Sequence, residues 1–256
     1  MADALIVFAA TAMEMRAVLE GAGLDIPSPE KGGVSFAGIR GVPVHLAVTG
    51  VGPLAAAHMA GKLAGQGFFT AAKCRGALNF GIAGTYSPFG APLGSVVLAN
   101  REIWPEYGVR TAIGVDAEKL GFPLRGKKTD LTAVWDTVPL DPEAALQAMG
   151  LFSPHAAPEL PENPRVTVGG SVTVAGVSGT AAIAGDLAGK YAALTENMEG
   201  FPLALAAMEA GVPFAEVRAI SNIVGERSAA AWNIPASLAA LSRAAALIFA
   251  GQVRPR

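Results

Sequence analysis

The stretch ALIVFAATAMEMRAVLEG, residues 4–21, sets the type of fold. Its first six residues, 4–9, are all apolar, and this short run predicts a buried strand. Residues 13–20 follow with apolar side chains at helical spacing and predict a helix. A buried strand that leads directly into a helix is the repeating unit of sheets covered by helices. The stretch therefore favours an α/β fold.

The same alternation of strand-like and helix-like segments continues outward along the chain. We predict further strands at residues 34–39, 42–48, 75–80, 95–99, 166–175 and 214–220. We predict helices at residues 54–64, 142–149, 181–191, 200–210 and 235–250. Glycine-rich turns at 49–52 and 81–84 follow two of the strands, and Arg40-Gly41 closes a hairpin. Residues 101–165 contain eight prolines and are predicted as loops around their one helix.

Composition excludes several classes of partner. The chain of 256 residues has 19 Lys and Arg against 21 Asp and Glu, without the basic stretch that nucleic acid or an anionic membrane would require. The uncharged segments 77–100 and 166–185 are broken by prolines or glycines, which argues against a membrane span. An acidic residue at position 3 argues against a signal peptide. We expect one domain over residues 1–256, a cytoplasmic location and a small-molecule partner.

Neither a metal nor a cofactor is expected. Cys74 is the sole cysteine, so the chain can form no internal disulfide and no pair of thiolate ligands. His45, His58 and His155 lie on a predicted strand, a helix and a proline-rich loop, without the spacing of metal ligands.

Four segments carry chemically active residues near the predicted ends of strands. They are AATAMEMR, TGVGPLAAA, LNFGIAG, and ENMEG followed by VPFAEVRAISN. In an α/β sheet, ligands bind at the carboxyl ends of strands, so these segments can meet in one site. Their order and spacing over nearly the whole chain resemble the superfamily of purine nucleoside phosphorylases and nucleosidases. The resemblance implies a three-layer fold in which helices flank a central mixed β-sheet.

Two glutamates receive roles from this resemblance. Glu14 stands at the place of the acid that activates the attacking water in methylthioadenosine/S-adenosylhomocysteine nucleosidases. Met198-Glu199 stands at the place of a Met-Glu pair whose carboxylate holds the ribose hydroxyls while the methionine packs near the sugar. Both glutamates also suit the first turn of a helix, where the dipole favours an acid, so a purely structural role is the alternative.

The segments around the predicted base site depart from the adenine-specific relatives. Those relatives have Ser-Asp where this chain has Ser221-Asn222. An amide cannot act as a general acid, but its NH2 group can donate hydrogen bonds to N7 and to the 6-oxo group, which favours hypoxanthine. Asparagine can also pair with adenine, or simply close a turn. The resemblance further implies nucleoside contacts at Gly81 and Ile82, although Ile82 replaces a small hydroxyl residue of many nucleosidases.

Hydrolysis is favoured over phosphorolysis. One branch of phosphorylases has an arginine before the glycine of the segment that matches LNFGIAG, whereas this chain has Asn79. The absence of that cation, together with a water-activating acid at Glu14, argues against a phosphate site. A purine nucleoside phosphorylase nevertheless remains an alternative, as do a methylthioadenosine/S-adenosylhomocysteine-type nucleosidase and a non-catalytic nucleoside-binding protein.

The runs RAISNIVGERSAAAW and GVSGTAA resemble the futalosine hydrolases in particular. Arg227 and Trp232 follow Ser-Asn at similar spacing, and a cation there has a purpose because futalosine carries a benzoate carboxylate. An exposed loop arginine and a packing tryptophan are the alternative reading. The resemblance also implies substrate contacts at Ser178 and Thr180. It implies hydrolysis of futalosine to hypoxanthine and dehypoxanthine futalosine, in menaquinone biosynthesis, by a homo-oligomer.

Overall fold

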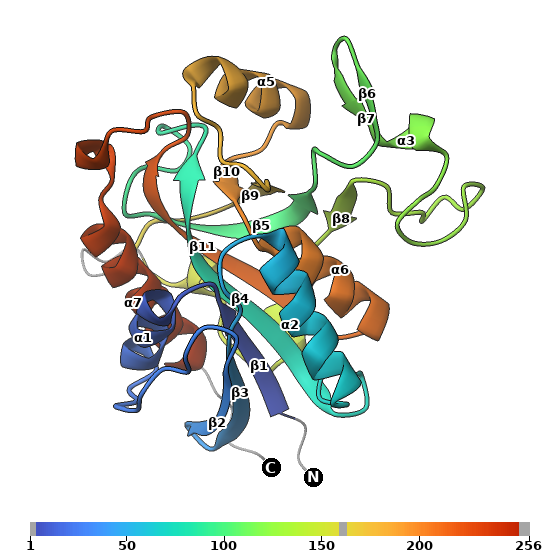
Figure 1. Ribbon diagram of the computed structural model, residues 1–256. Coiled ribbons are helices and arrows are strands. Elements are labelled where there is room, and N and C mark those ends of the chain that lie inside the picture. The colour runs from blue at the N-terminus through green and yellow to red at the C-terminus, as the bar shows by residue number, and fades with distance from the viewer. Residues whose placement is uncertain (1–3, 159–162, 251–256) are drawn as a thin grey trace.

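The computed structural model describes residues 4–158 and 163–250. A nine-stranded mixed sheet runs through it in the order β10-β9-β5-β11-β4-β1-β3-β2, and β8 pairs with β5 outside this path. Helices cover both faces of the sheet (Figure 1). The predicted fold class, a central mixed sheet flanked by helices, is confirmed.

The opening segment folds as predicted. Strand β1 (Ala4–Ala9) is buried along its whole length, and helix α1 (Ala12–Gly21) follows at once. The Thr11 hydroxyl accepts a hydrogen bond from the Glu14 backbone, while the Glu14 carboxylate accepts one from the Thr11 N–H. This reciprocal capping box fixes where α1 begins and anchors the Glu14 side chain at the end of β1.

The predicted hairpin and the turn that follows it are also confirmed. Strands β2 (Val34–Ile39) and β3 (Val42–Val48) pair antiparallel, and Arg40 and Gly41 turn between them with positive φ angles of 48° and 85°. Gly52 has a φ of 102° just before helix α2 (Pro53–Gly65). A side chain at Gly52 would be strained, so the glycine-rich turn is a backbone requirement.

The second predicted glycine turn, residues 81–84, is wrong. Strand β4 (Cys74–Thr85) continues through these glycines and pairs with β1, β10 and β11 (Phe214–Ile223). Neither Gly81 nor Gly84 takes a positive φ. A Cβ at Gly81 would instead collide with the Arg218 guanidinium, and one at Gly84 would press on Val224 and the Asn222 amide. These glycines therefore make room for neighbouring side chains, which a sequence pattern for turns cannot distinguish.

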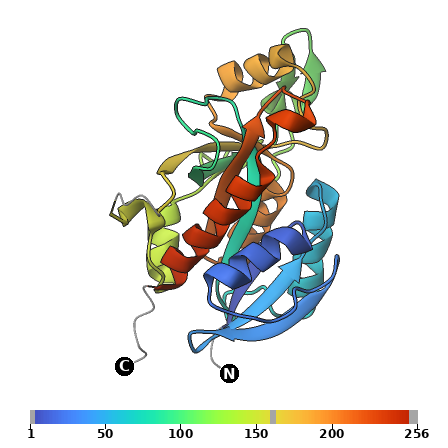
Figure 2. The same ribbon diagram turned by 90° about the vertical axis from the view of Figure 1, so that its left-hand side faces the viewer.

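The sheet separates two hydrophobic cores, because successive side chains of a strand point to opposite faces. In β1, Leu5 and Val7 face one core with α1 and helix α7 (Ile234–Ala250), while Ile6 and Phe8 face the other core. That second core contains α2 and helix α6 (Gly200–Ala210). Figure 2 shows α1 and α7 side by side on their face of the sheet. Among the described residues, no helix is long and apolar enough to cross a membrane.

The region 101–165 contains more structure than predicted. The predicted helix is present as α4 (Pro142–Ala148), and strand β5 extends over Val96–Ile103. The additional elements are β6 (Val109–Thr111), β7 (Gly114–Asp116), α3 (Ala117–Leu120), β8 (Thr137–Pro139) and the 3-10 turn η1 (Pro154–Ala156). Strands of three residues are too short to show a period, so only their pairing partners reveal them.

The last third of the chain agrees closely with prediction. It comprises β9 (Val166–Thr173), α5 (Ala181–Tyr191), α6, β11, the 3-10 turn η2 (Ala229–Ala231) and α7. The prediction missed β10 (Thr195–Asn197), which lies between β9 and the end of β4. This short strand carries the residues that precede Met198-Glu199 into the middle of the molecule.

Candidate active site

A cavity of about 330 Å³ lies where β1, β4, β10 and β11 end. Its lining comprises Ala10, Thr11, Glu14, Val51, Ile82, Ala83, Gly84, Val177, Ser178, Glu196, Asn197, Met198, Glu199, Ser221, Asn222, Val224, Gly225, Arg227 and Trp232. Most of the predicted site residues therefore share one cavity, although they come from segments separated by as many as 200 residues in sequence.

Two predicted residues lie outside this lining. The Thr180 hydroxyl accepts a hydrogen bond from the Ile183 N–H and caps α5. Gly81 sits behind the wall, where its missing side chain leaves space for the Arg218 guanidinium near the Glu14 carboxylate.

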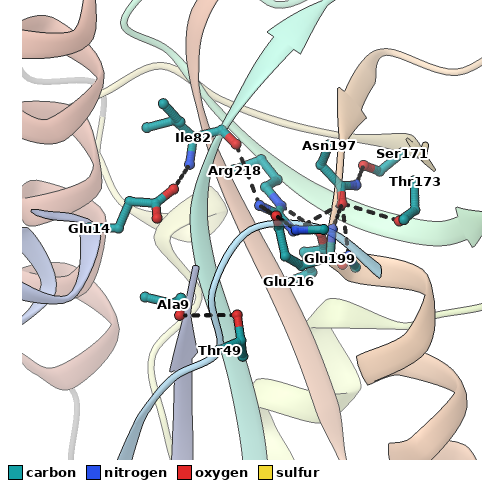
Figure 3. Close-up of polar contacts among 12 residues, drawn as sticks. Ala9, Glu14, Thr49, Ile82, Ser171, Thr173, Asn197, Glu199, Glu216 and Arg218 are labelled. Carbon is teal, nitrogen blue, oxygen red and sulfur yellow. Dashed lines mark hydrogen bonds and ion pairs between the residues drawn. The ribbon is translucent and has the colours of Figure 1, made fainter. Parts of the chain in front are cut away.

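Glu14 is buried and held by three donors. One carboxylate oxygen accepts from the Thr11 N–H (2.9 Å) and hydroxyl (2.7 Å), and the other accepts from the Ile82 N–H (2.9 Å). Figure 3 shows this carboxylate pointing from α1 to the Ile82 backbone. Burial raises the pKa of Glu14 above its ordinary value, against the lowering effect of these hydrogen bonds. Of about four acceptor positions on a carboxylate, one remains for a ligand.

Glu199 is held by one backbone donor and one cation. Its carboxylate accepts a hydrogen bond from the Gly52 N–H at 3.0 Å and pairs with Arg218 at 3.3 Å. The glycine-rich turn predicted from TGVG thus fixes a glutamate 147 residues away in sequence. Two acceptor positions remain on the Glu199 carboxylate, which lines the cavity.

Arg218, which was not predicted from the sequence, is buried behind the cavity and contacts Glu199 of its lining. The side chain is 1% exposed, and its guanidinium contacts the Ile82 carbonyl, Glu199, Glu216 and Asn197 (Figure 3). Burial alone would lower the pKa of Arg218, but the surrounding carboxylates raise it, so the side chain stays charged. Arg218 joins the two halves of the site, since it bridges β4 and the start of α6.

A pair of buried acids supports Arg218 from behind. Glu216 accepts from the Arg218 Nε at 2.6 Å, and Glu102 accepts from the Thr173 hydroxyl at 2.6 Å. Both carboxylates pack against the position that a side chain of Gly200 would occupy. Burial, and then the charge of Glu216, raise the pKa of Glu102 well above its usual range, which favours its neutral form. This arrangement explains the glycine that follows Glu199 in ENMEG.

Asn197 connects these groups through its amide oxygen. That oxygen accepts from the backbone N–H groups of Glu199 and Gly200, both at 2.8 Å, and from Arg218 at 3.1 Å. Its NH2 group donates to Ser171 and Glu102. Glu199 is the N-cap of α6, but its side chain makes no capping hydrogen bond. Asn197 instead accepts from the free N–H groups at the start of the helix, which leaves the Glu199 carboxylate available to the cavity.

These supporting residues left a weak signal in the sequence. Glu216 and Arg218 are opposite charges two positions apart in an otherwise apolar strand, which places both on one face of the sheet. Charges buried in a central strand need partners, so this pair could have been recognised as part of a site.

Asn222 lies beside the cavity as predicted, but fewer of its donors are available. Its NH2 group donates to the Ile223 carbonyl at 3.0 Å, and its oxygen accepts from the Ser221 hydroxyl at 2.9 Å. One N–H therefore remains for a ligand, so the amide can serve N7 or the 6-oxo group in this orientation, and not both.

Arg227 and Trp232 lie together at the exposed side of the cavity. The guanidinium is 5.3 Å from the centre of the indole ring, within the range of a cation–π contact. Arg227 is solvent-exposed, so a charged group of a ligand could reach it without crossing the buried network. Among the described residues, no group of three or more His, Cys, Asp or Glu could hold a metal ion.

Comparisons with known proteins identify relatives of this chain. The model of the phosphorylase superfamily matches residues 4–250. A futalosine hydrolase of Thermus thermophilus is 32% identical over 213 residues, which cover 82% of this chain and 83% of that protein. A futalosine hydrolase of Streptomyces coelicolor is 39% identical over 169 residues, covering 65% of this chain, and the chain spans 62% of that relative's length.

A solved structure shows the same fold. The structure of a futalosine hydrolase mutant of Helicobacter pylori matches with a TM-score of 0.69 over 95% of both chains, at 16% identity. The family match over residues 4–250 and the identity to the Thermus protein establish homology at the level of sequence. The chain belongs to the phosphorylase superfamily and, within it, to the family of the futalosine hydrolases.

Proposed function

We propose that this protein hydrolyses the N-glycosidic bond of futalosine to give hypoxanthine and dehypoxanthine futalosine. The observation that carries the proposal is the pair of buried carboxylates, Glu14 and Glu199, in one cavity. Each is fixed by backbone donors and keeps acceptor positions for a ligand. Futalosine is the substrate named for the relatives, and the same reaction would place this chain in menaquinone biosynthesis.

Glu14 would activate the water. A water molecule in the cavity can donate to the remaining acceptor position of Glu14, and its oxygen then bonds to C1′ as its proton passes to the carboxylate. The bond between C1′ and the base breaks, and its electron pair leaves with the purine, which takes up a proton from solvent while Glu14 returns its proton to solvent. Because the sugar becomes positively charged in this transition state, carboxylates nearby stabilise it.

Glu199 would hold the ribose, and Asn222 the leaving base. The two open acceptor positions of Glu199 match two sugar hydroxyls, and a fixed ribose needs less ordering at the transition state. The free N–H of Asn222 can donate to purine N7, where negative charge accumulates as the base departs. Met198 in the lining would pack against the sugar.

The charges of the cavity support water over phosphate as the nucleophile. Glu14, Glu196 and Glu199 line it, and the buried cation Arg218 is already paired with Glu199 and Glu216. A phosphate ion beside these carboxylates would be repelled at short range in a poorly hydrated site. Hydrolysis needs only a neutral water at the same place.

Chromatography of the products tests the proposal. Incubation of the protein with futalosine should release hypoxanthine at a rate that does not depend on added phosphate. Dependence on phosphate, with a sugar phosphate among the products, would identify a phosphorylase. Preferential cleavage of methylthioadenosine or S-adenosylhomocysteine would identify the other nucleosidase, and binding without cleavage of any purine nucleoside would identify a nucleoside-binding protein.

Arg227 would contact the benzoate carboxylate of futalosine. We expect Arg227→Ala to lower kcat/KM for futalosine by about 10- to 150-fold, the range for loss of a hydrogen bond to a charged group. Inosine lacks the benzoate, so its kcat/KM should change much less. Steady-state kinetics on both substrates measures the difference. Equal losses on futalosine and inosine would remove Arg227 from carboxylate recognition.

We also propose a homo-oligomer that forms through the face made by α2 and α6. An apolar groove of about 630 Å³ runs between these helices, bordered by small residues such as Ala57, Gly61 and Ala206. Leu54 projects beside it and is 86% exposed. A protruding apolar side chain next to an apolar groove on one surface is self-complementary, which two-fold packing of identical chains requires.

Sedimentation velocity tests this assembly. The wild-type protein should sediment as a multiple of 25.9 kDa, and Leu54→Glu should raise the dissociation constant by roughly 100-fold or more, because it buries an unpaired charge. Leu131→Glu is the matched control, since Leu131 is fully exposed and does not line the groove. Monomeric wild-type protein, or equal effects of the two variants, would contradict the proposal.

The cytoplasmic location predicted from the sequence belongs to the same proposal. Its support is chemical: Cys74 is the sole thiol and lies buried, so the protein has no internal disulfide that an oxidising compartment would maintain.

A further inference from the structure

Glu196 is a buried acid of the cavity to which the proposed reaction gives no role. It lies on β10 opposite Gly84 of β4, and Asn222 of β11 pairs with the same Gly84 from the other side. The three strands therefore align Glu196, Gly84 and Asn222 in one row across the sheet. Neighbouring strands are roughly 4.8 Å apart, so the backbones of Glu196 and Asn222 stand about 10 Å from each other across the sheet.

The row forms part of one wall of the cavity. Glu196, Gly84 and Asn222 all line the cavity, and the Asn222 amide lies over the space that a side chain at Gly84 would occupy. The wall thus presents a carboxylate from β10 and an amide from β11, and Gly84 between them leaves room for that amide.

The Glu196 carboxylate is held rigidly by three donors. One oxygen accepts from the Ser178 N–H at 2.9 Å, and the other accepts from the Ser178 hydroxyl at 2.5 Å and from the Tyr86 hydroxyl at 2.9 Å. Burial, and then the charge of Glu196, raise the pKa of Tyr86, so the phenol remains a donor. Glu196 itself is only 6% exposed.

One acceptor position of this carboxylate is left over. Three donors occupy three of about four positions, and the open one is on the oxygen that accepts from the Ser178 N–H. Ser178 and Tyr86 donate hydrogen bonds to the Glu196 carboxylate but carry no positive charge that would neutralise it. A ligand that meets Glu196 must therefore supply a hydrogen-bond donor, because an acceptor there would face a buried carboxylate.

We propose that Glu196 recognises the base by accepting a hydrogen bond from N1–H of a 6-oxopurine, while Asn222 contacts the N7 end of the same edge. The inference rests on the proposed nucleosidase function and adds its specificity. In a 6-oxopurine, N7 and O6 are acceptors and N1 carries a proton. The N1–H donor can therefore meet the Glu196 carboxylate, while the N7 acceptor meets the Asn222 NH2 group. In a 6-aminopurine, N1 is an unprotonated acceptor and faces the carboxylate unfavourably. Glu196 therefore selects hypoxanthine over adenine.

Two variants of Glu196 separate its acceptor from its charge. Glu196→Leu removes the acceptor, so the ratio of kcat/KM for futalosine to that for its 6-amino analogue should fall by roughly 5- to 150-fold, the cost of mispairing one buried polar group. Glu196→Gln is the matched control. Its oxygen can still accept from the Ser178 N–H and from N1–H while its NH2 meets the two hydroxyls, so it should keep most of the preference. A ratio within one variant is independent of the fraction of folded protein.

Calorimetric binding of the free bases tests Glu196 independently of catalysis. The wild-type protein and the Gln variant should bind hypoxanthine more tightly than adenine, and the Leu variant should lose this difference. The 1-methyl derivative of hypoxanthine, which has no N1–H, should bind the wild type at least about tenfold more weakly than hypoxanthine and the Leu variant about as well as hypoxanthine. If futalosine is not cleaved but the bases behave in this way, the proposed function fails and the role of Glu196 stands. An unchanged preference in Glu196→Leu, for substrates or bases, would overturn the role.

Discussion

Glu14→Gln is expected to lower the turnover of futalosine by about 10² to 10⁴, because it removes the base that takes the proton from water. Glutamine keeps the shape of the side chain and is also accepted at this position of a capping box, so α1 can persist. Its single oxygen can accept from the Thr11 N–H or from the Ile82 N–H, one of the two backbone donors that the carboxylate now serves. The loss would therefore report on proton transfer and not on folding. Single-turnover measurements with the enzyme in saturating excess over substrate give the rate of the chemical step directly.

The pH dependence provides a second measurement on Glu14. Burial raises its pKa above the ordinary value of 4.5, and a general base must be deprotonated to act. Activity should thus fall as the pH decreases through this raised pKa, so the acidic midpoint of kcat/KM should lie above 4.5 in the wild type. The residual activity of Glu14→Gln should lack this acidic limb.

Glu20→Gln is the matched control for Glu14, since it makes the same change at an exposed position of the same helix. It should leave both the rate and the pH profile unaltered. Near-normal turnover in Glu14→Gln, or an acidic limb that survives the substitution, would show that another group activates the water.

Glu199→Gln is expected to lower kcat/KM for futalosine by about 10- to 150-fold. The carboxylate accepts from the Gly52 N–H and pairs with Arg218, and its remaining positions would hold the ribose hydroxyls. An amide can keep the bond to Gly52 and one bond to the sugar through its oxygen. It places its NH2 group against the Arg218 guanidinium and loses one charge-assisted bond to the sugar, worth about 1.5 to 3 kcal/mol.

The 2′-deoxy analogue of the substrate distinguishes ribose binding from structural support. This analogue lacks one of the hydroxyls that Glu199 would hold, so the substitution should affect it much less than the ribonucleoside. Comparison of kcat/KM for the two substrates, in the wild type and the variant, gives the coupling between carboxylate and hydroxyl. Equal losses on both substrates would assign Glu199 to the support of Arg218 alone.

The sequence by itself determined most of the elements and the two principal acids. The strand at residues 4–9, the hairpin over 34–48 and the helix at 200–210 were predictable because their periodicity and turn residues are local properties of the chain. Glu14 and Glu199 were predicted because the segments that carry them resemble those of the nucleosidases in order and spacing. Order and spacing survive in a linear pattern, so the predicted cavity residues could be named before their positions in space were known.

Only the tertiary structure decided how the site is supported and which further acids enter it. The glycines at 81 and 84 resemble a turn in sequence, yet they continue β4 because Arg218 and Asn222 from another strand occupy the space above them. Glu196 faces Asn222 only because β10 and β11 both pair with β4, although they are separated by the whole of α6. Strand pairing between distant segments depends on the burial of both faces of the sheet. That is a property of the assembled core, and no local sequence pattern records it.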